Sequence, residues 1–542
     1  MTLFSKSARG QKAPHFYRVV ESNGFCIVYQ DGNEVQRFVA VNNLPEALKT
    51  LQEINALQCH NGMPIYQQYC SEGIYFWSLI QESLFYDVLV PYIKYQELIH
   101  WWRVNVGFET PTGLAPCDHC ISIITASHLT RNQTVLQTAR ELLETLALFV
   151  NAVAVNVYRR ISGARFLLWS LNSFWGRDWL DYRLKDVYSE LWSRHIAFIE
   201  TFPFPGFAAA LRRLLRSRRL CLFVPNIGYI QPSAYKHLIH ITYAGEVTGI
   251  PREHLTRILQ YFELKIANAQ RQSRLFTKFL SITGLKQVYA IDEHTSFAPL
   301  VYACRKLTMN LVGMQHGVFH KYSVGWTCPG IPRQFTAGYD KILVWGEYWQ
   351  ALLARLSTVY RPDELLPTGY IRPSAFNLAP RQHQPLKSSE FRILVFYEFL
   401  ANPDETFQYI ETFHKKGYRI FFKIRFDDPV KSQLGSIPRD WVHPVHDLTQ
   451  DFLDTINVCA GTMTSMMYEL YVLGVPVWFL SMRNDNNVRM VEDGLAHLIT
   501  LDMLSDSAFN PYSRLLNPTK QGSIAAAEGI PCAVSRLAAV HA

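Results

Sequence analysis

The sequence predicts an α/β protein with two successive parallel-sheet domains and a smaller α+β domain before them. From residue 164 the chain repeats a buried strand, a glycine-bearing loop and a helix-length segment, which is the order of a parallel sheet covered by helices. A polar, proline-bearing linker at 381–389 interrupts the repeat, which then starts again. A chain of 542 residues, 49% of them hydrophobic, has enough material for about three domains with their own cores.

Composition excludes several classes of protein. Only 18% of the residues are charged and the apolar content is high, so the chain is globular rather than disordered. The net charge of +8 is modest for this length, and no nucleic-acid-binding motif occurs, so we expect no nucleic-acid partner. The first residues lack the apolar core of a secretory signal, and no apolar run is long enough to span a bilayer. We therefore expect a cytoplasmic protein with reduced cysteines.

The first 160 residues predict an α+β accessory domain. Residues 16–42 alternate as a small β-meander, and helical spacing follows at 44–57, 70–105 and 130–154. The most apolar stretch, 142–157, predicts a buried helix. Cys117 and Cys120 form the one close cysteine pair, and zinc would need a second pair, so a loop is expected there and no metal site.

The first parallel-sheet domain is expected at 161–385. Its predicted strands are 165–170, 220–224, 288–291, 311–314, 341–345 and 365–372. Its predicted helices are 180–198, 253–279, 297–307 and 348–356. An arginine cluster follows an aromatic loop in this domain and consists of Arg212, Arg213, Arg216, Arg218 and Arg219. Such a cluster can rest on anionic lipid headgroups, which makes an inner-membrane surface a candidate partner; the alternative is a solvated helix face.

The second parallel-sheet domain is expected at 386–510. Its predicted strands are 392–397, 418–423, 456–460 and 475–480, and its predicted helices are 403–415, 449–455 and 466–473. The tail, 511–542, is weakly patterned, with a helix expected near 525–537.

Polar residues follow two successive strands of the first domain. Asp292 and Glu293 come directly after one strand, and Gln315-His316-Gly317 ends the next. Ligands of open α/β sheets bind beyond the carboxyl ends of the strands, so Asp292, Glu293 and His316 are candidate general bases. The alternative is that the acids cap the next helix and His316 is structural. Gln315, Gly317, His320 and Lys321 are candidate substrate contacts.

In the second domain, the turn at 461–465 opens a helix. Free backbone N–H groups at a helix start form a phosphate site, and Gly461, Thr462, Thr464 and Ser465 supply them with nearby hydroxyls. Glu469 lies one helical turn beyond and could reach a ribose hydroxyl. The alternative is a capped helix with Glu469 on the surface. Lys423 and Arg425, at an earlier strand end, could neutralise a departing phosphate without a metal.

Three stretches, within about 160–485, resemble GT-B glycosyltransferases. The segment 461–469, five residues before Gly474-Val-Pro476, is similar to the nucleotide-binding turn and helix of that fold. Residues 423–429 resemble its basic strand end, although Arg425-Phe426 stands where His-Pro is common. Residues 315–330, with 344–347 and Gly369, resemble bacterial capsule and O-antigen transferases related to the β-Kdo and CDP-glycerol transferases.

The resemblance implies two Rossmann-like domains facing a cleft, the first holding the acceptor and the second the nucleotide-sugar. It implies a metal-independent Leloir glycosyltransferase in surface-polysaccharide synthesis that needs no cofactor besides its nucleotide-sugar co-substrate. We favour a CMP-linked acidic sugar such as Kdo, because the cleft offers cations for both phosphate and carboxylate. In a retaining mechanism Asp292 would attack as a nucleophile instead of a base. A CDP-polyol phosphotransferase and a non-catalytic glycan-binding or scaffold subunit are the alternatives.

Overall fold

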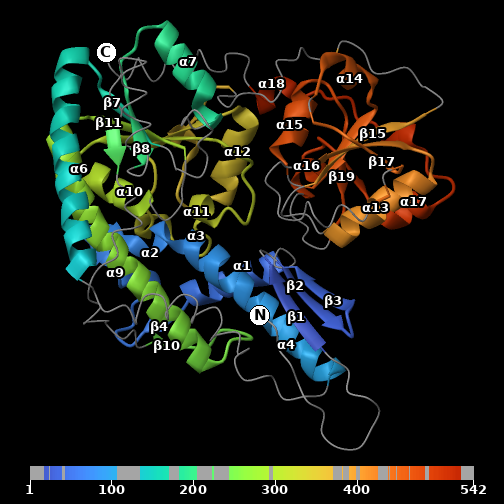
Figure 1. The fold of residues 1–542 in the computed structure, drawn as a ribbon, viewed down its shortest axis with the longest axis horizontal. Coiled ribbons are helices and arrows are strands. Elements are labelled where there is room, and N and C mark those ends of the chain that lie inside the picture. The colour runs from blue at the N-terminus through green and yellow to red at the C-terminus, as the bar shows by residue number, and fades with distance from the viewer. Residues whose placement is uncertain are drawn as a thin grey trace, which may run out of the picture. The chain divides into compact units, whose positions relative to one another are not determined.

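A computed structural model gives the fold of the chain (Figure 1). The residues that it describes are 17–22, 25–39, 43–106, 135–169, 182–203, 222–224, 243–291, 297–369, 381, 390–397, 403–424, 437–438, 440–446, 448–462, 464–482 and 488–525. The chain divides into two compact units. We call them the six-stranded unit, with Met1–Lys49, Val88–Cys120 and Ser374–Ile524, and the seven-stranded unit, with Thr50–Asp87, Ile121–Pro373 and Ala525–Ala542.

Seven described strands form the main sheet of the seven-stranded unit, and every pairing in it is parallel. Their order is β14-β13-β12-β11-β7-β8-β9. The strands are β7 (Phe166–Trp169), β8 (Ile199–Pro203), β9 (Leu222–Val224), β11 (Gln287–Ala290), β12 (Asn310–Met314), β13 (Lys341–Val344) and β14 (Leu365–Pro367). All four residues of β7 and of β11 are buried, as is usual for a parallel sheet covered by helices.

Helices cover this sheet. They are α6 (Val135–Ser162), α7 (Lys185–Ser193), α9 (Arg252–Thr283), α10 (Phe297–Lys306), α11 (Val324–Thr327) and α12 (Glu347–Leu356). Val187, Tyr188 and Leu191 of α7 join Phe166 and Tyr289 of the sheet in one buried apolar cluster. The helices α6, α9 and α10 lie side by side in Figure 1. The apolar stretch at 142–157 lies in α6, but the prediction that it is buried is wrong for one face of the helix.

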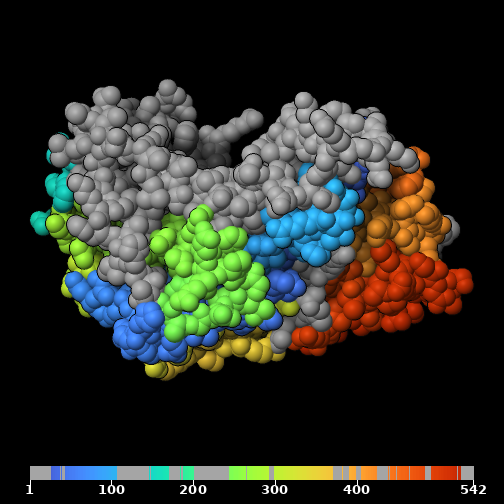
Figure 2. Space-filling view, turned by 90° about the horizontal axis from the view of Figure 1, so that it is seen from below, coloured from blue at the N-terminus to red at the C-terminus, as the bar shows by residue number. Residues whose placement is uncertain are grey.

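Residues before α6 also belong to this unit. Strand β4 (Gln58–Cys59) pairs antiparallel with β10 (Tyr243–Ala244), just before α9. Figure 2 shows the residues around β10 and the start of α9, in green, beside residues around β4, in blue, on one face. A second small ribbon, β5 (Cys70–Ser71) and β6 (Ile74–Tyr75), leads into α2 (Phe76–Leu79). Trp77 of α2 packs edge-on against Phe262 of α9, which anchors the segment to the helix.

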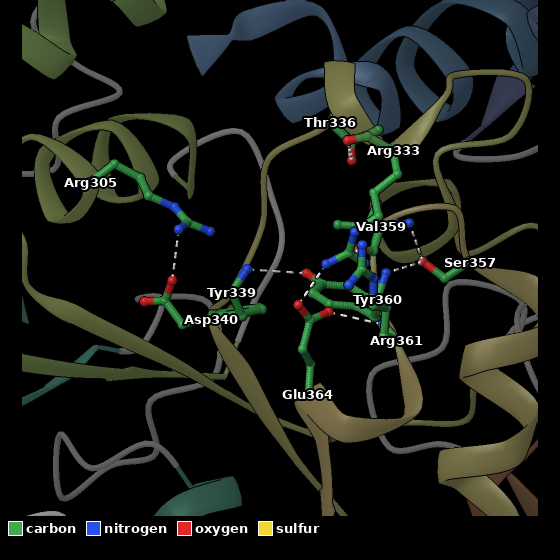
Figure 3. A network of polar contacts seen from close by, with 10 residues as sticks. All are labelled: Arg305, Arg333, Thr336, Tyr339, Asp340, Ser357, Val359, Tyr360, Arg361 and Glu364. Carbon is green, nitrogen blue, oxygen red and sulfur yellow. Dashed lines mark hydrogen bonds and ion pairs between the residues drawn. The ribbon is translucent and has the colours of Figure 1, made fainter. Parts of the chain in front are cut away.

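Polar contacts hold the amino ends of three neighbouring sheet strands (Figure 3). Asp340, just before β13, accepts the backbone N–H of Leu311 at 2.7 Å and pairs with Arg305 of α10 at 2.9 Å. In the same view Arg333 pairs with Glu364 at 2.5 Å, which joins the segment before β13 to the one before β14. These contacts lie at the edge opposite to the carboxyl ends of the strands, so they serve the scaffold.

The six-stranded unit contains a parallel sheet of six described strands in the order β17-β16-β15-β18-β19-β20. They are β15 (Arg392–Tyr397), β16 (Arg419–Ile424), β17 (Val442–Pro444), β18 (Val458–Gly461), β19 (Val477–Leu480) and β20 (His497–Ile499). The accompanying helices are α13 (Pro403–Lys415), α14 (Gln450–Thr455), α15 (Ser465–Val472), α16 (Val488–Glu492), α17 (Leu501–Ser505) and α18 (Gln521–Ile524).

The same unit includes an antiparallel meander. Strands β1 (Tyr17–Ser22), β2 (Phe25–Gln30) and β3 (Asn33–Val39) form it, and α4 (Val90–Asn105) packs on β3 through Phe38 and Trp101. The helix α1 (Leu44–Asn55) follows the meander. The predicted meander and the α/β class with two parallel sheets are confirmed. The first 160 residues, however, contribute to both units. The helix predicted near 525–537 lies almost wholly outside the described residues.

Candidate functional site

Both parallel sheets have a topological switch point. In the six-stranded unit β16 and β17 extend the sheet on one side of β15, and the chain then returns to place β18 on the other side. In the seven-stranded unit β8 and β9 lie on one side of β7, and β11 begins the other side. Loops diverge at the carboxyl ends of such neighbouring strands and leave a crevice where ligands of α/β proteins bind. Each sheet therefore has one preferred place for a site.

The predicted turn Gly461–Ser465 lies at the switch point of the six-stranded unit. It follows β18, which pairs with β15 through Ala460 and Val395. The turn ends at Thr464, the N-cap of α15, whose hydroxyl accepts the backbone N–H of Met466 at 3.2 Å. The start of a helix is thus held at the switch point, with its first N–H groups at the carboxyl edge of the sheet.

The side chains of this turn differ in their exposure. Thr462 and Thr464 are buried, with 4% and 5% of their surface exposed, whereas Ser465 is half-buried. A Cβ on Gly461 would lie 3.0 Å from the sulfur of Met467, so the turn packs closely on its own helix. Of the hydroxyls predicted to contact a phosphate, that of Ser465 is therefore the most accessible.

Glu469 is buried, with 7% of its surface exposed. The alternative prediction, a glutamate on the helix surface, is therefore wrong. Glu469 lies one turn beyond Ser465 in α15, and a contact between its carboxylate and a ribose stays a prediction.

Gly474 of the Gly-Val-Pro segment ends α15. Its φ is +87°, a conformation that glycine adopts without strain, and a Cβ there would also lie 3.4 Å from Cβ of Arg381. This glycine of the resemblance therefore has a structural role.

Lys423 lies near the carboxyl end of β16, opposite Phe396 of β15. Gly461 lies on the other side of β15, so the two are two strands apart, or about 10 Å between backbones. The ammonium group of Lys423 donates to the backbone carbonyl of His446 at 2.6 Å. Arg425 lies outside the described residues, so the predicted pair of cations is described for Lys423 alone.

The acids predicted in the seven-stranded unit, Asp292 and Glu293, lie outside the described residues. They follow Ile291 directly in the sequence, and Ile291 comes immediately after β11, the strand beside the switch point. Their roles stay predictions, as does that of the arginine cluster at 212–219, which is also outside the described residues.

Gln315 joins two neighbouring strand ends. Its side chain accepts the backbone N–H of Trp345 at 2.9 Å and donates to the carbonyl of Gly317 at 2.9 Å. The indole N–H of Trp345 donates to the Gln315 carbonyl at 3.0 Å. Gln315 has no exposed surface, so these bonds give it a structural role, and the predicted substrate contact would need this side chain to become exposed.

His316 and Gly317 follow Gln315 and are both half-buried. The backbone of Gly317 is outside the left-handed region, and a Cβ placed there would meet no atom within 4 Å. The fold therefore does not require glycine at this position. The remaining reason for a glycine at position 317 is that it lets the backbone approach a ligand closely.

His320 is held as a neutral imidazole. Its Nδ1 accepts the backbone N–H of Tyr322 at 3.2 Å, which leaves the ring proton on Nε2. Burial lowers the pKa of His320 to about 4, because it disfavours the charged ring. Lys321 is exposed, and its ammonium lies 5.1 Å from the ring centroid of Tyr322. Contacts of either residue with a substrate stay predictions.

Tyr397 was not predicted from sequence to lie at the switch point. This residue ends β15, the strand at the switch point, and is buried, with 2% of its surface exposed. The signal was present in the sequence, since β15 is the first strand of the second repeat and the first strand of each repeat lies at the switch point in both sheets.

Among the described residues, no cluster of three or more histidine, cysteine or acidic side chains could hold a metal ion. In the same part of the chain, no helix combines the length and the apolar character needed to cross a bilayer.

Comparisons with known proteins give no family. No family model matches the sequence, and no curated protein matches it significantly. The solved structures that it resembles include the calicheamicin glycosyltransferase CalG4, at 14% identity and a TM-score of 0.41, over 69% of this chain and 98% of that one. The glycosyltransferase SnogD from Streptomyces nogalater is 12% identical, with a TM-score of 0.37, over 70% and 99%.

A third structure is the UDP-GlcNAc 2-epimerase from Neisseria meningitidis bound to UDP-GlcNAc, at 12% identity and a TM-score of 0.38, over 69% of this chain and 100% of that one. These identities and TM-scores are low, so the proposal that follows depends on the strand ends of this chain and not on these proteins.

Proposed function

We propose that the protein is a glycosyltransferase of the GT-B type that moves a sugar from a nucleotide-activated donor to a glycan acceptor. The observation that carries the proposal is the position of the turn Gly461–Ser465. Its sequence resembles a nucleotide-binding turn, and it opens α15 at the switch point of its sheet. A sequence pattern and a sheet topology, which are independent, thus favour the same place.

The donor half of the mechanism uses positive charge and the start of a helix. As the glycosidic bond to the phosphate breaks, negative charge grows on the departing nucleotide. Backbone N–H groups at the start of α15, the hydroxyl of Ser465 and the ammonium of Lys423 would stabilise that charge. Arg425, two residues after Lys423 in the sequence, is a further candidate. Such groups can replace a metal ion, so we propose a metal-independent reaction.

The acceptor half needs a base. The attacking hydroxyl loses its proton as it bonds to the anomeric carbon, and Asp292, Glu293 or His316 would take that proton. In a retaining reaction Asp292 would form a covalent glycosyl intermediate instead. Transfer also requires both strand edges to reach one donor and acceptor pair, and this requirement stays a prediction.

For the donor we propose a CMP-linked acidic sugar such as Kdo, and for the pathway the synthesis of a bacterial surface polysaccharide, with the acceptor free or lipid-linked. The support is the resemblance of residues 315–330, the position of Lys423 and the presence of Arg425 two residues later in the sequence. A CDP-glycerol donor is the nearest alternative, and it would use the same nucleotide site.

A nucleotide panel tests the proposal. We expect CMP to raise the melting temperature more than CDP, UDP, GDP or TDP, since a ligand of the native state stabilises it by mass action. We also expect Lys423→Ala to weaken nucleotide affinity by roughly 10- to 100-fold, because it removes a charge-assisted contact with phosphate.

Lys416→Ala is a matched control for that variant. Lys416 lies in the same unit and also donates to a backbone carbonyl, that of Asp506, at 2.6 Å. We expect this variant to bind nucleotide like the parent. If no nucleotide shifts the melting temperature at millimolar concentration, the donor site is wrong. If nucleotide binds but no donor is turned over, a non-catalytic glycan-binding subunit is the better account.

A further inference from the structure

The helix α6 has an inner face that packs against its own unit. Leu148, Ala152 and Val155 are buried on this face. Further along it, the amide of Asn156 donates to the carbonyl of Ile282 at 2.6 Å, and Nε of Arg159 donates to the carbonyl of Thr283 at 3.2 Å. These contacts tie α6 along α9, as Figure 1 shows, and they account for the apolar residues of the inner face.

The same helix has a second apolar stripe that faces solvent. Its members are Leu146, Val150, Val153, Val157 and Ile161, which are between 52% and 82% exposed. They make up five of the eight large hydrophobic side chains that the described residues expose, so the exposure is concentrated on one helix face rather than scattered. We call this stripe the α6 seam.

The α6 seam has the spacing of a helix–helix contact. Its residues follow one another at intervals of four, three, four and four, which places them on one face over about 22 Å of helix. Ala154 is also exposed beside them, and none of the exposed residues from Leu146 to Val157 is charged. A helix that is apolar on opposite faces is usually buried on both, so the seam needs a partner.

We infer that the partner is a second copy of this chain, with the two α6 helices packed seam to seam. The residues of the α6 seam are uncharged, so its partner needs no complementary charge. Two copies related by a two-fold axis present the same uncharged stripe to each other. Val150 and Val157, one heptad apart, are β-branched, as two-stranded helical pairs prefer at one of their two contact positions.

A lipid surface fits the α6 seam less well than a second copy does. Helices that lie in a membrane interface carry lysine and arginine on their polar face and tryptophan, phenylalanine or leucine on the apolar one. The seam is mostly valine, and the opposite face of α6 is packed on α9 instead of being polar. Its small side chains suit close helix packing better than insertion among acyl chains.

The interface is expected to be weak. A stable dimer usually buries about 800 Å² per partner, and one helix face supplies only part of that area. We therefore expect a dimer that dissociates on dilution through the micromolar range.

Sedimentation velocity of the full chain tests the inference. Over a dilution series, we expect the mass to rise from the 62.5 kDa of one chain towards twice that value. The variant Val150→Glu/Val157→Glu should remain monomeric at every concentration and keep its helical circular dichroism, because both side chains are exposed. Lys278→Glu changes the net charge by the same amount on an exposed position of α9, and it should dimerise like the parent.

Cross-linking gives a second measurement that does not depend on a destabilising change. Val153→Cys, near the middle of the α6 seam, should form a disulfide between copies under mild oxidation, whereas Arg271→Cys on an exposed position of α9 should give no more than the background of the parent. A parent chain that is monomeric at all concentrations, or a folded double variant that still dimerises, overturns the inference. So does a monomeric parent that floats with vesicles of phosphatidylglycerol and phosphatidylethanolamine and loses flotation in the double variant.

Discussion

At the scale of residues, the structure separates side chains that serve the fold from those left for ligands. Gln315 and Gly474 belong to motifs that resemble a glycosyltransferase, yet one is occupied by bonds between strand ends and the other ends a helix with φ of +87°. Gly317 has neither constraint. Sequence alone could not distinguish these cases, because a motif shows which residue type occurs at a position but not which neighbouring atoms it contacts.

Two glycine substitutions test that distinction. Gly317→Ala should change the free energy of unfolding by less than about 0.5 kcal/mol, because a Cβ fits there, and should lower activity by crowding the ligand. Gly474→Ala should destabilise by about 1–3 kcal/mol, because alanine is strained at positive φ. Denaturant unfolding and transfer assays measure both effects. Full activity in Gly317→Ala would contradict a ligand close to this backbone.

A buried acid in α9 gives a prediction about pH. Glu263 is 4% exposed, and burial raises its pKa to about 7, with the Tyr69 hydroxyl offsetting only part of the effect. The folded state therefore holds this proton more tightly than the unfolded chain, so the stabilisation is complete below about pH 4.3 and is lost as pH rises through 7.

Glu263→Gln removes the ionisation and tests that sign. We expect the variant to be more stable than the parent at pH 8, with the advantage shrinking as the pH falls to 5. Denaturant unfolding at the two pH values measures it. A difference between variant and parent that is the same at both values would show that Glu263 does not titrate differently in the folded state.

At the scale of elements, strong patterns were predicted and short ones were missed. The long helix α9 and the apolar strands β15 and β19 were predicted because their many apolar residues indicate burial. The strands β8, β17 and β20 were not, since they are short and two of them end in proline, which favours loops in a sequence. Their sheet positions depend on tertiary pairing, which local sequence does not contain.

The N-cap of α15 tests whether this element binds the donor. Thr464→Ala should cost about 1 kcal/mol of stability and weaken nucleotide binding, because the first turn of α15 loses its anchor. Thr449 caps α14 in the same way, with its hydroxyl accepting the N–H of Phe452 at 3.3 Å. Thr449→Ala should therefore cost similar stability and leave nucleotide affinity unchanged. Calorimetric titration of both variants with nucleotide measures the two affinities. An equal loss of affinity in both would point to a general effect of destabilisation.

At the scale of the whole molecule, each unit contains a parallel sheet with a switch point, and the predicted turn at Gly461 lies at one of them. Asp292 and Glu293 follow the strand β11, and Gly461 ends the strand β18. The class of fold followed from the repeat of strand and helix. The grouping of the first 160 residues into both units did not, because it depends on contacts between segments far apart in the chain.

The most direct test of the account is the rate of sugar transfer in Asp292→Asn, Glu293→Gln and His316→Asn, measured beside nucleotide affinity in the same preparations. We predict that at least one of them lowers the rate by about 100-fold or more while nucleotide affinity stays at the level of the parent, because a lost base affects only proton transfer. Transfer at the parent's rate in all three variants would contradict the account.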